Sequence, residues 1–172
     1  MGYDLPASVG AAVARGGKRV ICLAGDGSIQ LNIQELQMVV HHQLPVKIFV
    51  LDNGGYLSIR QTQSNFFGKL VGESPASGIS FPDMTRIAAA YGLPAIRVER
   101  ASELGSMEAL LNAPGPALCH VRLDPAQEFE PRLKSRQLPD GQMVSPSLED
   151  MYPFLSREEL RENILTGQEA AR

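Results

Sequence analysis

Two short acidic-glycine segments carry the residue types that could do chemistry in this sequence. Gly25-Asp26-Gly27 and Asp52-Asn53 are separated by 24 residues, and each follows an apolar run typical of a buried strand. A carboxylate and a carboxamide offer hard oxygen ligands, which suit Mg²⁺ or Ca²⁺, and Mg²⁺ in proteins is commonly shared with phosphate oxygens. These residue types therefore predict a metal site with a phosphate beside it.

Each segment is also a common turn when it is taken alone, because Gly, Asp and Asn all favour turns. The combination favours a binding site, since ligands of open parallel sheets lie beyond the carboxyl ends of the strands. Gly27 and Ser28 also precede a predicted helix, and the first N–H groups of a helix attract phosphate.

The flanking segments predict an α/β fold, with a doubly wound, mostly parallel sheet and helices on both of its faces. Short apolar runs predict strands at 19–24, 46–51, 94–99 and 116–122. Apolar spacing and boundary residues predict helices at 6–15, 30–42, 83–91 and 102–112. Alternating strands and helices of these lengths are typical of doubly wound sheets.

The segment 124–172 differs in kind from the α/β domain predicted for 1–123. It contains five prolines, little periodicity and one short predicted helix near 157–164. We expect an extended tail that packs along the domain or across a subunit boundary.

The composition is that of a globular protein, with 44% hydrophobic and 20% charged residues and a net charge of −3. No basic surplus favours nucleic acid or an anionic membrane, and the longest apolar run is far shorter than a membrane helix. Cys22 and Cys119 lie in strand-like runs, where we expect buried, reduced thiols. That expectation favours a cytoplasmic location.

The sequence resembles the thiamine-diphosphate-dependent enzymes, and among them the acetolactate-synthase-like group. The family signature is Gly-Asp-Gly, a gap of this size and Asn-Asn, which is close to Gly25-Asp26-Gly27 and Asp52-Asn53. Further segments match the family, and the likeness covers roughly residues 1–125. These segments are the opening run from Met1 to Ala11, Ile33-Gln34-Glu35-Leu36, Leu44-Pro45-Val46-Lys47 and Pro82-Asp83.

The resemblance implies a site for thiamine diphosphate and Mg²⁺. It implies Asp26, Asn53 and the backbone carbonyl of Gly55 as metal ligands. It also implies that main-chain groups hold the diphosphate, at Gly25, Gly27 and Ser28.

Three further residues would shape the cofactor pocket. Met1 matches the bulky apolar residue that supports the bent cofactor beneath its thiazolium ring, while Tyr56 and Leu57 would line the site. Position 52 departs from the family, because Asp stands where Asn is usual and adds a negative charge near the metal. The following segment, from Arg60 to Phe67, is either substrate-facing or an ordinary packed helix.

The family mechanism also needs a glutamate that activates the aminopyrimidine of the cofactor, and this residue belongs to a separate pyrimidine-binding domain. Glu35 lies on the helix after the diphosphate turn and is expected to be solvated or packed, so no catalytic residue is predicted in this chain. The family's domain normally has a leading strand and helix before the residue that matches Met1. We therefore expect a truncated reading frame, an excised fragment or a subunit of a split enzyme.

Three functions stay open on these grounds. The first is an acetolactate-synthase-like component, a transferase that decarboxylates a 2-oxo acid and joins it to a second carbonyl compound. The second is a 2-oxo acid decarboxylase or lyase component, and the third is a non-catalytic remnant that binds cofactor or partners. A homo- or hetero-oligomer is expected, because such sites form between domains.

Overall fold

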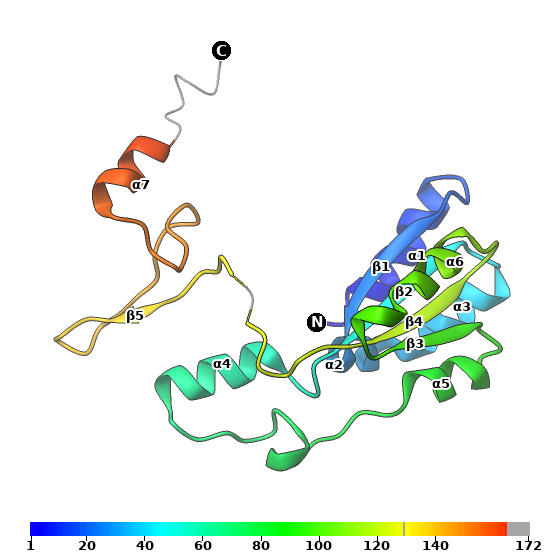
Figure 1. Ribbon diagram of the computed structural model, residues 1–172, viewed down its shortest axis with the longest axis horizontal. Coiled ribbons are helices and arrows are strands. Elements are labelled where there is room, and N and C mark those ends of the chain that lie inside the picture. The colour runs from blue at the N-terminus through cyan, green and yellow to red at the C-terminus, as the bar shows by residue number, and fades with distance from the viewer. Residues whose placement is uncertain (129, 165–172) are drawn as a thin grey trace. The chain divides into compact units, whose positions relative to one another are not determined.

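The computed structural model describes residues 1–128 and 130–164. The chain divides into two compact units, Met1–Ala126 and a second that begins at Gln127. The first unit contains the sheet and both acidic-glycine segments (Figure 1).

A four-stranded parallel sheet forms the centre of the first unit, and it confirms the predicted fold class. Its strands are β1 Val20–Gly25, β2 Val46–Asp52, β3 Ala95–Val98 and β4 Ala117–Arg122. Their order across the sheet is β1-β2-β4-β3, and every pair is parallel. The predicted strands thus match the observed ones to within about two residues, the usual uncertainty of element ends.

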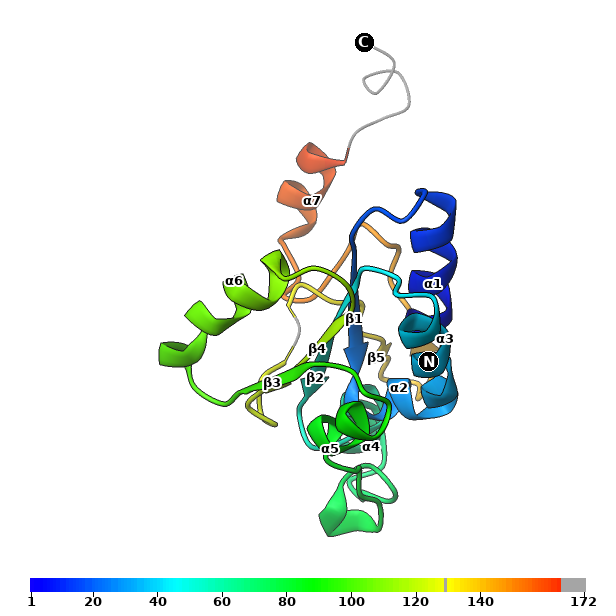
Figure 2. The ribbon, with the colours of Figure 1, turned by 90° about the vertical axis from the view of Figure 1, so that its right-hand side faces the viewer.

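Helices cover both faces of this sheet, as a doubly wound fold requires. Helix α6 (Gly105–Asn112) lies on one side, while α1 (Asp4–Ala14) and α3 (Leu36–His41) lie on the other (Figure 2). Helix α5 (Met84–Ala90) contributes to the same core as α1 and α3. Because right-handed crossovers place α3 and α5 on one face, the return from β3 to β4 puts α6 on the opposite face.

Two hydrophobic clusters separate along these faces. The larger cluster joins α1, α3 and α5 to the sheet and includes Leu5, Leu36, Val39, Ile48 and Met84, each at most 1% exposed. The smaller cluster lies under α6 and consists of Phe49, Val98, Leu110, Ala117 and Cys119.

One buried cation supports the α6 side of the sheet. Lys47, on β2, is only 1% exposed, and its Nζ donates to the carbonyl oxygens of Ala113 and Gly115 at 2.7 and 2.8 Å. Both carbonyls follow the end of α6, where helices leave backbone acceptors without intrahelical partners. Lys47 therefore satisfies acceptors that burial would otherwise leave unbonded.

The prediction of one continuous helix over 30–42 is wrong. The chain instead forms α2 (Asp26–Ile29), a 3-10 segment η1 (Gln30–Glu35) and then α3, with non-helical angles at Asn32 (φ −138°, ψ 37°). The side-chain amide of Asn32 donates to the Gly2 carbonyl at 2.5 Å. This contact with the start of the chain accompanies the break in the helix.

After β2 the chain forms α4 (Leu57–Phe66), which buries none of its residues fully, and the short 3-10 turn η2 (Pro75–Ser77). The segment from Arg60 to Phe67 is therefore mostly helical. Another 3-10 turn, η3 (Ala101–Glu103), precedes α6.

The second unit contains a small antiparallel hairpin of β5 (Arg136–Gln137) and β6 (Met143–Val144). The ammonium group of Lys134 lies 4.1 Å from the centre of the Tyr152 ring. The helix expected near 157–164 is α7 (Arg157–Asn163), and its N-cap hydroxyl, on Ser156, accepts from the Glu159 amide. No helix in the described parts of the chain has the length and apolar character needed to cross a membrane.

Candidate functional site

The two acidic-glycine segments meet at Asp26. This residue directly follows β1, and it is 4% exposed. Its Oδ1 accepts from the Gly27 amide at 2.8 Å, and its Oδ2 accepts from the Gly55 amide at 3.0 Å. Because β1 and β2 are adjacent parallel strands, the turns that follow them are joined by this one carboxylate.

The expected start of the helix that follows the Gly25-Asp26-Gly27 turn needs a small correction. Gly25 ends β1 and caps α2, so Gly27 and Ser28 lie inside the first helical turn rather than before it. The cause is that Asp26 already has helical backbone angles directly after the strand.

Asn53 carries the atom that most directly suggests a ligand. Its Oδ1 is buried and has no hydrogen-bond partner within residues 1–128 and 130–164. A buried amide oxygen without a partner is unfavourable unless a ligand or water fills the role. The same described residues contain no cluster of three or more His, Cys, Asp or Glu side chains placed to hold a metal. A metal held here would therefore need carboxamide, backbone and phosphate oxygens besides Asp26, which is a donor set that suits Mg²⁺.

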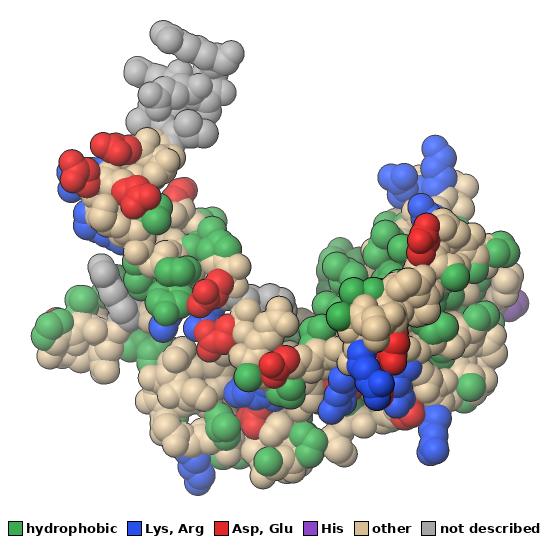
Figure 3. All heavy atoms as spheres, viewed as in Figure 1, with side chains coloured by type: hydrophobic (Ala, Val, Ile, Leu, Met, Phe, Trp, Pro, Cys, Tyr) green, Lys and Arg blue, Asp and Glu red, His purple; other side chains and the backbone are tan. Residues whose placement is uncertain are grey.

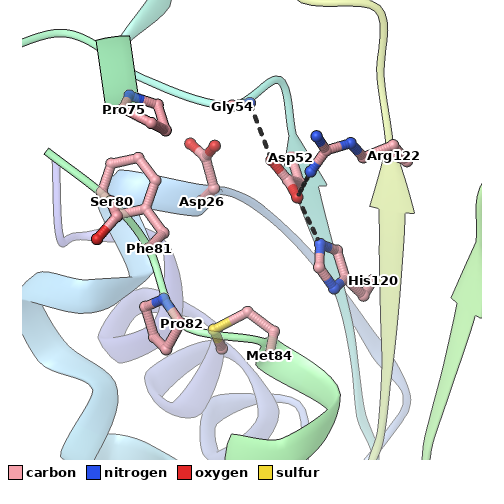
Figure 4. Close-up of a pocket in the computed structure, with 10 residues that line it drawn as sticks. All are labelled: Asp26, Asp52, Gly54, Pro75, Ser80, Phe81, Pro82, Met84, His120 and Arg122. Atoms are coloured by element: carbon pink, nitrogen blue, oxygen red, sulfur yellow. Dashed lines mark hydrogen bonds and ion pairs between the residues drawn. The ribbon is translucent and has the colours of Figure 1, made fainter. Parts of the chain in front are cut away.

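Asp52, at the end of β2, is hydrogen-bonded to two side chains of β4. Its Oδ2 accepts from His120 Nε2 at 2.8 Å and from Arg122 Nη1 at 2.6 Å (Figure 4). The sheet register places Arg122 directly opposite Asp52. The charge that departs from the family pattern thus has two donors on the adjacent strand.

The two neighbouring carboxyl groups have opposite pKa shifts. Burial raises the pKa of Asp26 to about 6, and the nearby Asp52 carboxylate adds to the rise. Burial also acts to raise the pKa of Asp52, but donors from His120, the Gly54 amide and Arg122 outweigh it and lower that pKa. Below about pH 6 the negative charge of the pair therefore resides on Asp52, and above it both carboxyl groups are ionised.

Tyr56 packs against the Gly25-Asp26-Gly27 turn, which is the proposed diphosphate turn. A Cβ atom on Gly27 would collide with the Tyr56 ring, so only glycine permits this contact. The Tyr56 ring packs edge-on against Phe81, with ring centroids 5.3 Å apart. Leu57 follows as the first residue of α4 and is partly buried.

The start of the chain is tied to the same turn through Ser28. The Ser28 hydroxyl accepts from the Gly2 amide at 2.9 Å and donates to Asp4 Oδ2 at 2.6 Å. Met1 is thereby held next to the turn, with 74% of its surface exposed. An exposed apolar side chain in this position is available to contact a ligand.

A small cavity of about 130 Å³ opens beside Asp26 (Figure 4). It lies where the ends of β2 and β4 face the segment that leads into α5. Its lining residues are Asp26, Asp52, Gly54, Pro75, Ser80, Phe81, Pro82, Met84, His120 and Arg122.

Several residues around the site were missed by the sequence reasoning. Four residues bond to the predicted site segments but do not belong to the Gly-Asp-Gly and Asp-Asn motif: Asp4, Glu73, His120 and Arg122. One signal was present, because a carboxylate at position 52 next to a second carboxylate requires a positively charged or donor side chain nearby. Nothing in the sequence says which strand supplies it.

A parallel α/β sheet with acidic-glycine turns joined at its carboxyl edge is typical of a domain that binds a phosphate-bearing cofactor. The sequence profile of the family described as "Thiamine pyrophosphate enzyme, C-terminal TPP binding domain" matches residues 1–121. This chain belongs to that family, whose C-terminal domain binds thiamine diphosphate.

Individual relatives agree with this assignment. The chain is 37% identical over 152 residues to the acetolactate synthase isozyme 2 large subunit of Escherichia coli, covering 88% of this chain and 26% of that protein. It is 38% identical over 133 residues to the isozyme 1 large subunit of the same organism, covering 76% and 23%. It is also 38% identical over 143 residues to a probable chloroplastic acetolactate synthase 2 of rice (Oryza sativa subsp. japonica), covering 78% and 22%. The chain thus spans about a quarter of the length of the relatives it matches.

Proposed function

We propose that this chain is the cofactor-binding portion of an acetolactate-synthase-like enzyme, which decarboxylates a 2-oxo acid and joins it to a second carbonyl compound. One observation carries the site assignment: the Asp26 carboxylate joins both glycine turns, and the second turn contains Asn53, whose buried Oδ1 has no hydrogen-bond partner among the described residues. Residues 1–123 would form the cofactor domain, and 124–172 the tail.

In this proposal the metal is Mg²⁺, and its protein ligands are Asp26 Oδ, Asn53 Oδ1 and the Gly55 carbonyl. The Asp26 carboxylate is already oriented by two backbone amides, so little reorganisation accompanies binding. The Gly55 amide is one of these donors, which fixes the neighbouring peptide of the turn.

The remaining site residues would bind and orient the organic cofactor. Gly25, Gly27 and Ser28 hold the diphosphate through main-chain groups at the start of α2. Met1 supports the cofactor beneath its thiazolium ring, and Tyr56 and Leu57 line the pocket. Bound thiamine diphosphate supplies an electron sink for decarboxylation of the 2-oxo acid.

The activating glutamate would come from a pyrimidine-binding domain, either on another chain or on an upstream segment. Exposed apolar side chains on the first unit support such an assembly, because Ile21 and Leu23 on β1 are 54% and 63% exposed. Hydrophobic side chains also gather at the surface over this unit in the space-filling view (Figure 3). A cytoplasmic location is supported by the free, buried thiols of Cys22 and Cys119.

Calorimetric titration of the full chain with thiamine diphosphate, in the presence and absence of Mg²⁺, tests the site. We expect binding that requires Mg²⁺ and that is lost in Asp26→Ala. The matched control is Asp140→Ala, because Asp140 is exposed and lies in the second unit. Equal binding by wild type and Asp26→Ala, or no binding by the wild type, would overturn the assignment.

Turnover then tests the reaction class. The chain would be mixed with the pyrimidine-binding domain of an acetolactate synthase and supplied with pyruvate. Formation of acetolactate supports the proposed synthase, release of acetaldehyde alone indicates a simple decarboxylase, and binding without turnover indicates a remnant.

A further inference from the structure

The turn that follows β2 packs against a buried ion pair that the site assignment does not use. Arg60, in the first turns of α4, donates through Nε to Glu73 Oε2 at 2.6 Å. The Arg60 side chain is 18% exposed and that of Glu73 only 3%. The pair thus joins α4 to the segment that precedes η2.

Glu73 is held by more than this one cation. Its second carboxylate oxygen accepts from the hydroxyls of Ser74 and Ser77, and its amide donates to Ser77 Oγ at 2.9 Å. A carboxylate buried this deeply is stable only when it is paired and fully hydrogen-bonded. The local sequence therefore builds an anchor for Glu73 and, through it, for the backbone at position 73.

That backbone lies directly against the turn of Asn53, Gly54 and Gly55 that follows β2, which is the proposed metal turn. The Tyr56 amide donates to the Glu73 carbonyl at 2.8 Å. A Cβ atom on Gly55 would collide with the same carbonyl and would lie 2.7 Å from Arg60 Nη2. Gly55 is thus enclosed by Asp26 on one side and by both members of the ion pair on the other.

Arg60 reaches a third segment as well. Its Nη1 donates to the Pro125 carbonyl at 2.8 Å, beyond the end of β4. A guanidinium group can serve these separate acceptors because its donors are spread in a rigid plane, whereas a lysine ammonium is a single point on a flexible stem. The arrangement needs arginine in particular.

We infer that Arg60 and Glu73 are positioning residues for the metal site. They hold the Gly55 peptide so that its carbonyl is available to the metal, without touching the metal themselves. The inference rests on the proposed function, since it takes the Gly55 carbonyl as a ligand. The Arg60–Glu73 ion pair also links α4 to the metal turn, so a change that increases the mobility of one should increase the mobility of the other.

The test uses Mn²⁺ as the probe, titrated into the full chain at saturating thiamine diphosphate. The variants are Arg60→Lys, which keeps the charge but loses the fork, and Glu73→Gln, which keeps the shape but loses the charge. We expect each variant to bind Mn²⁺ about tenfold or more weakly, as is found for residues that orient metal ligands. Hydrogen exchange of the unliganded variants should be faster at the amides of Gly55 and Tyr56, while core strand amides stay protected.

Two control variants separate positioning from general destabilisation. Arg157→Lys makes the same change in an ion pair of the second unit, where Arg157 bonds Asp150 at 2.6 Å. Lys47→Met destabilises the first unit away from the turn. Both controls should retain wild-type Mn²⁺ affinity at temperatures where they are folded.

The outcomes distinguish this inference from the proposed function. If the wild type binds Mn²⁺ and both test variants bind it equally well, the positioning role is overturned and the cofactor site stands. If Lys47→Met weakens binding as much as the test variants do, the effect is one of stability and the inference also fails. If the wild-type chain binds no Mn²⁺ with the cofactor, the proposed function and this inference fall together.

Discussion

Asp52 Oδ2 lies 2.8 Å from His120 Nε2, so the end of β2 is bonded to a β4 side chain on the adjacent strand. This contact explains how a carboxylate is accommodated beside Asp26, because Arg122 donates to the same oxygen. These two donors stabilise the additional carboxylate at the carboxyl end of β2 and fix its orientation.

Replacing Asp52 by Asn should weaken Mg²⁺ binding without abolishing it. The change removes a negative charge next to the metal turn but keeps the shape of the side chain, and it leaves Asp26 and Asn53 in place. We expect affinity to fall by about threefold to tenfold, or roughly 1 kcal/mol. Mg²⁺ titration at saturating cofactor measures it. Complete loss of binding would instead identify Asp52 as a direct ligand, and unchanged affinity would show that its charge is fully screened.

Gly27→Ala should disrupt the diphosphate turn, because the new methyl group collides with the Tyr56 ring. Overpacking of this kind costs about 1–3 kcal/mol, and the displaced Tyr56 should also reduce cofactor affinity. The matched control is Gly10→Ala, within α1, where the added methyl meets nothing within 4 Å. That variant should gain about 0.5–1 kcal/mol from helix propensity. Urea unfolding compares the two, and equal stabilities would contradict the packing argument.

Lys47→Met should lower the free energy of unfolding by about 3 kcal/mol. The methionine keeps most of the buried volume but leaves the carbonyls of Ala113 and Gly115 without their donor. Lys18→Met, at an exposed lysine, is the control and should change stability by less than about 0.5 kcal/mol. Thermal unfolding provides the measurement. A small effect at position 47 would mean that other donors reach these carbonyls.

Asp83 should make the stability of the fold depend on acid. The Thr85 hydroxyl and the Arg97 guanidinium lower the pKa of Asp83 below its unfolded value of 3.8. A lowered folded pKa means that the ionised form stabilises the fold above pH 3.8, and that this contribution is lost as the pH falls through the folded pKa.

Asp83 is also the N-cap of α5, since its Oδ1 accepts from the Thr85 amide at 2.9 Å. Asp83→Ala should therefore lose about 0.5–2 kcal/mol at pH 7, and the difference from wild type should narrow below about pH 3.8. Asp83→Asn keeps a capping oxygen but cannot titrate, so it separates the two contributions. Urea midpoints at pH 7 and pH 3 decide, and a gap of the same size at both would rule out the ionic contribution.

Local patterns were sufficient to predict much of this domain. The four strands and the acidic-glycine turns follow from apolar runs that end in turn-forming residues, and parallel pairing of β1 and β2 then brings Gly25 and Asp52 to one edge. The helix break at Asn32 was not predictable, because it accompanies a bond to Gly2, which lies 30 residues earlier in the segment before α1. The apolar spacing of 30–42 is the same with or without that bond.

The side chains that surround the metal turn could not be predicted, for a related reason. Glu73 reaches Arg60 and Tyr56 only after an irregular loop folds back, and such loops carry no periodic signal. The contact of His120 with Asp52 depends on the strand order β1-β2-β4-β3, which the sequence pattern of the strand does not specify. The residues proposed to touch a ligand were predicted from the sequence, whereas Glu73 and His120, which bond to the segments that carry them, were not.

The strand order has a consequence for how the chain acquires this site during synthesis. β4 is the last strand of the sheet to leave the ribosome, yet it lies between β2 and β3, which have no hydrogen-bonded contact with each other. Until β4 inserts, the open edges of both neighbours are exposed to the aggregation that unpaired strands invite. The insertion completes the sheet and, in the same step, delivers His120 and Arg122 to Asp52. The donors to Asp52 are therefore added last, whereas the contact of Asp26 with both turns needs only the β1–β2 pair.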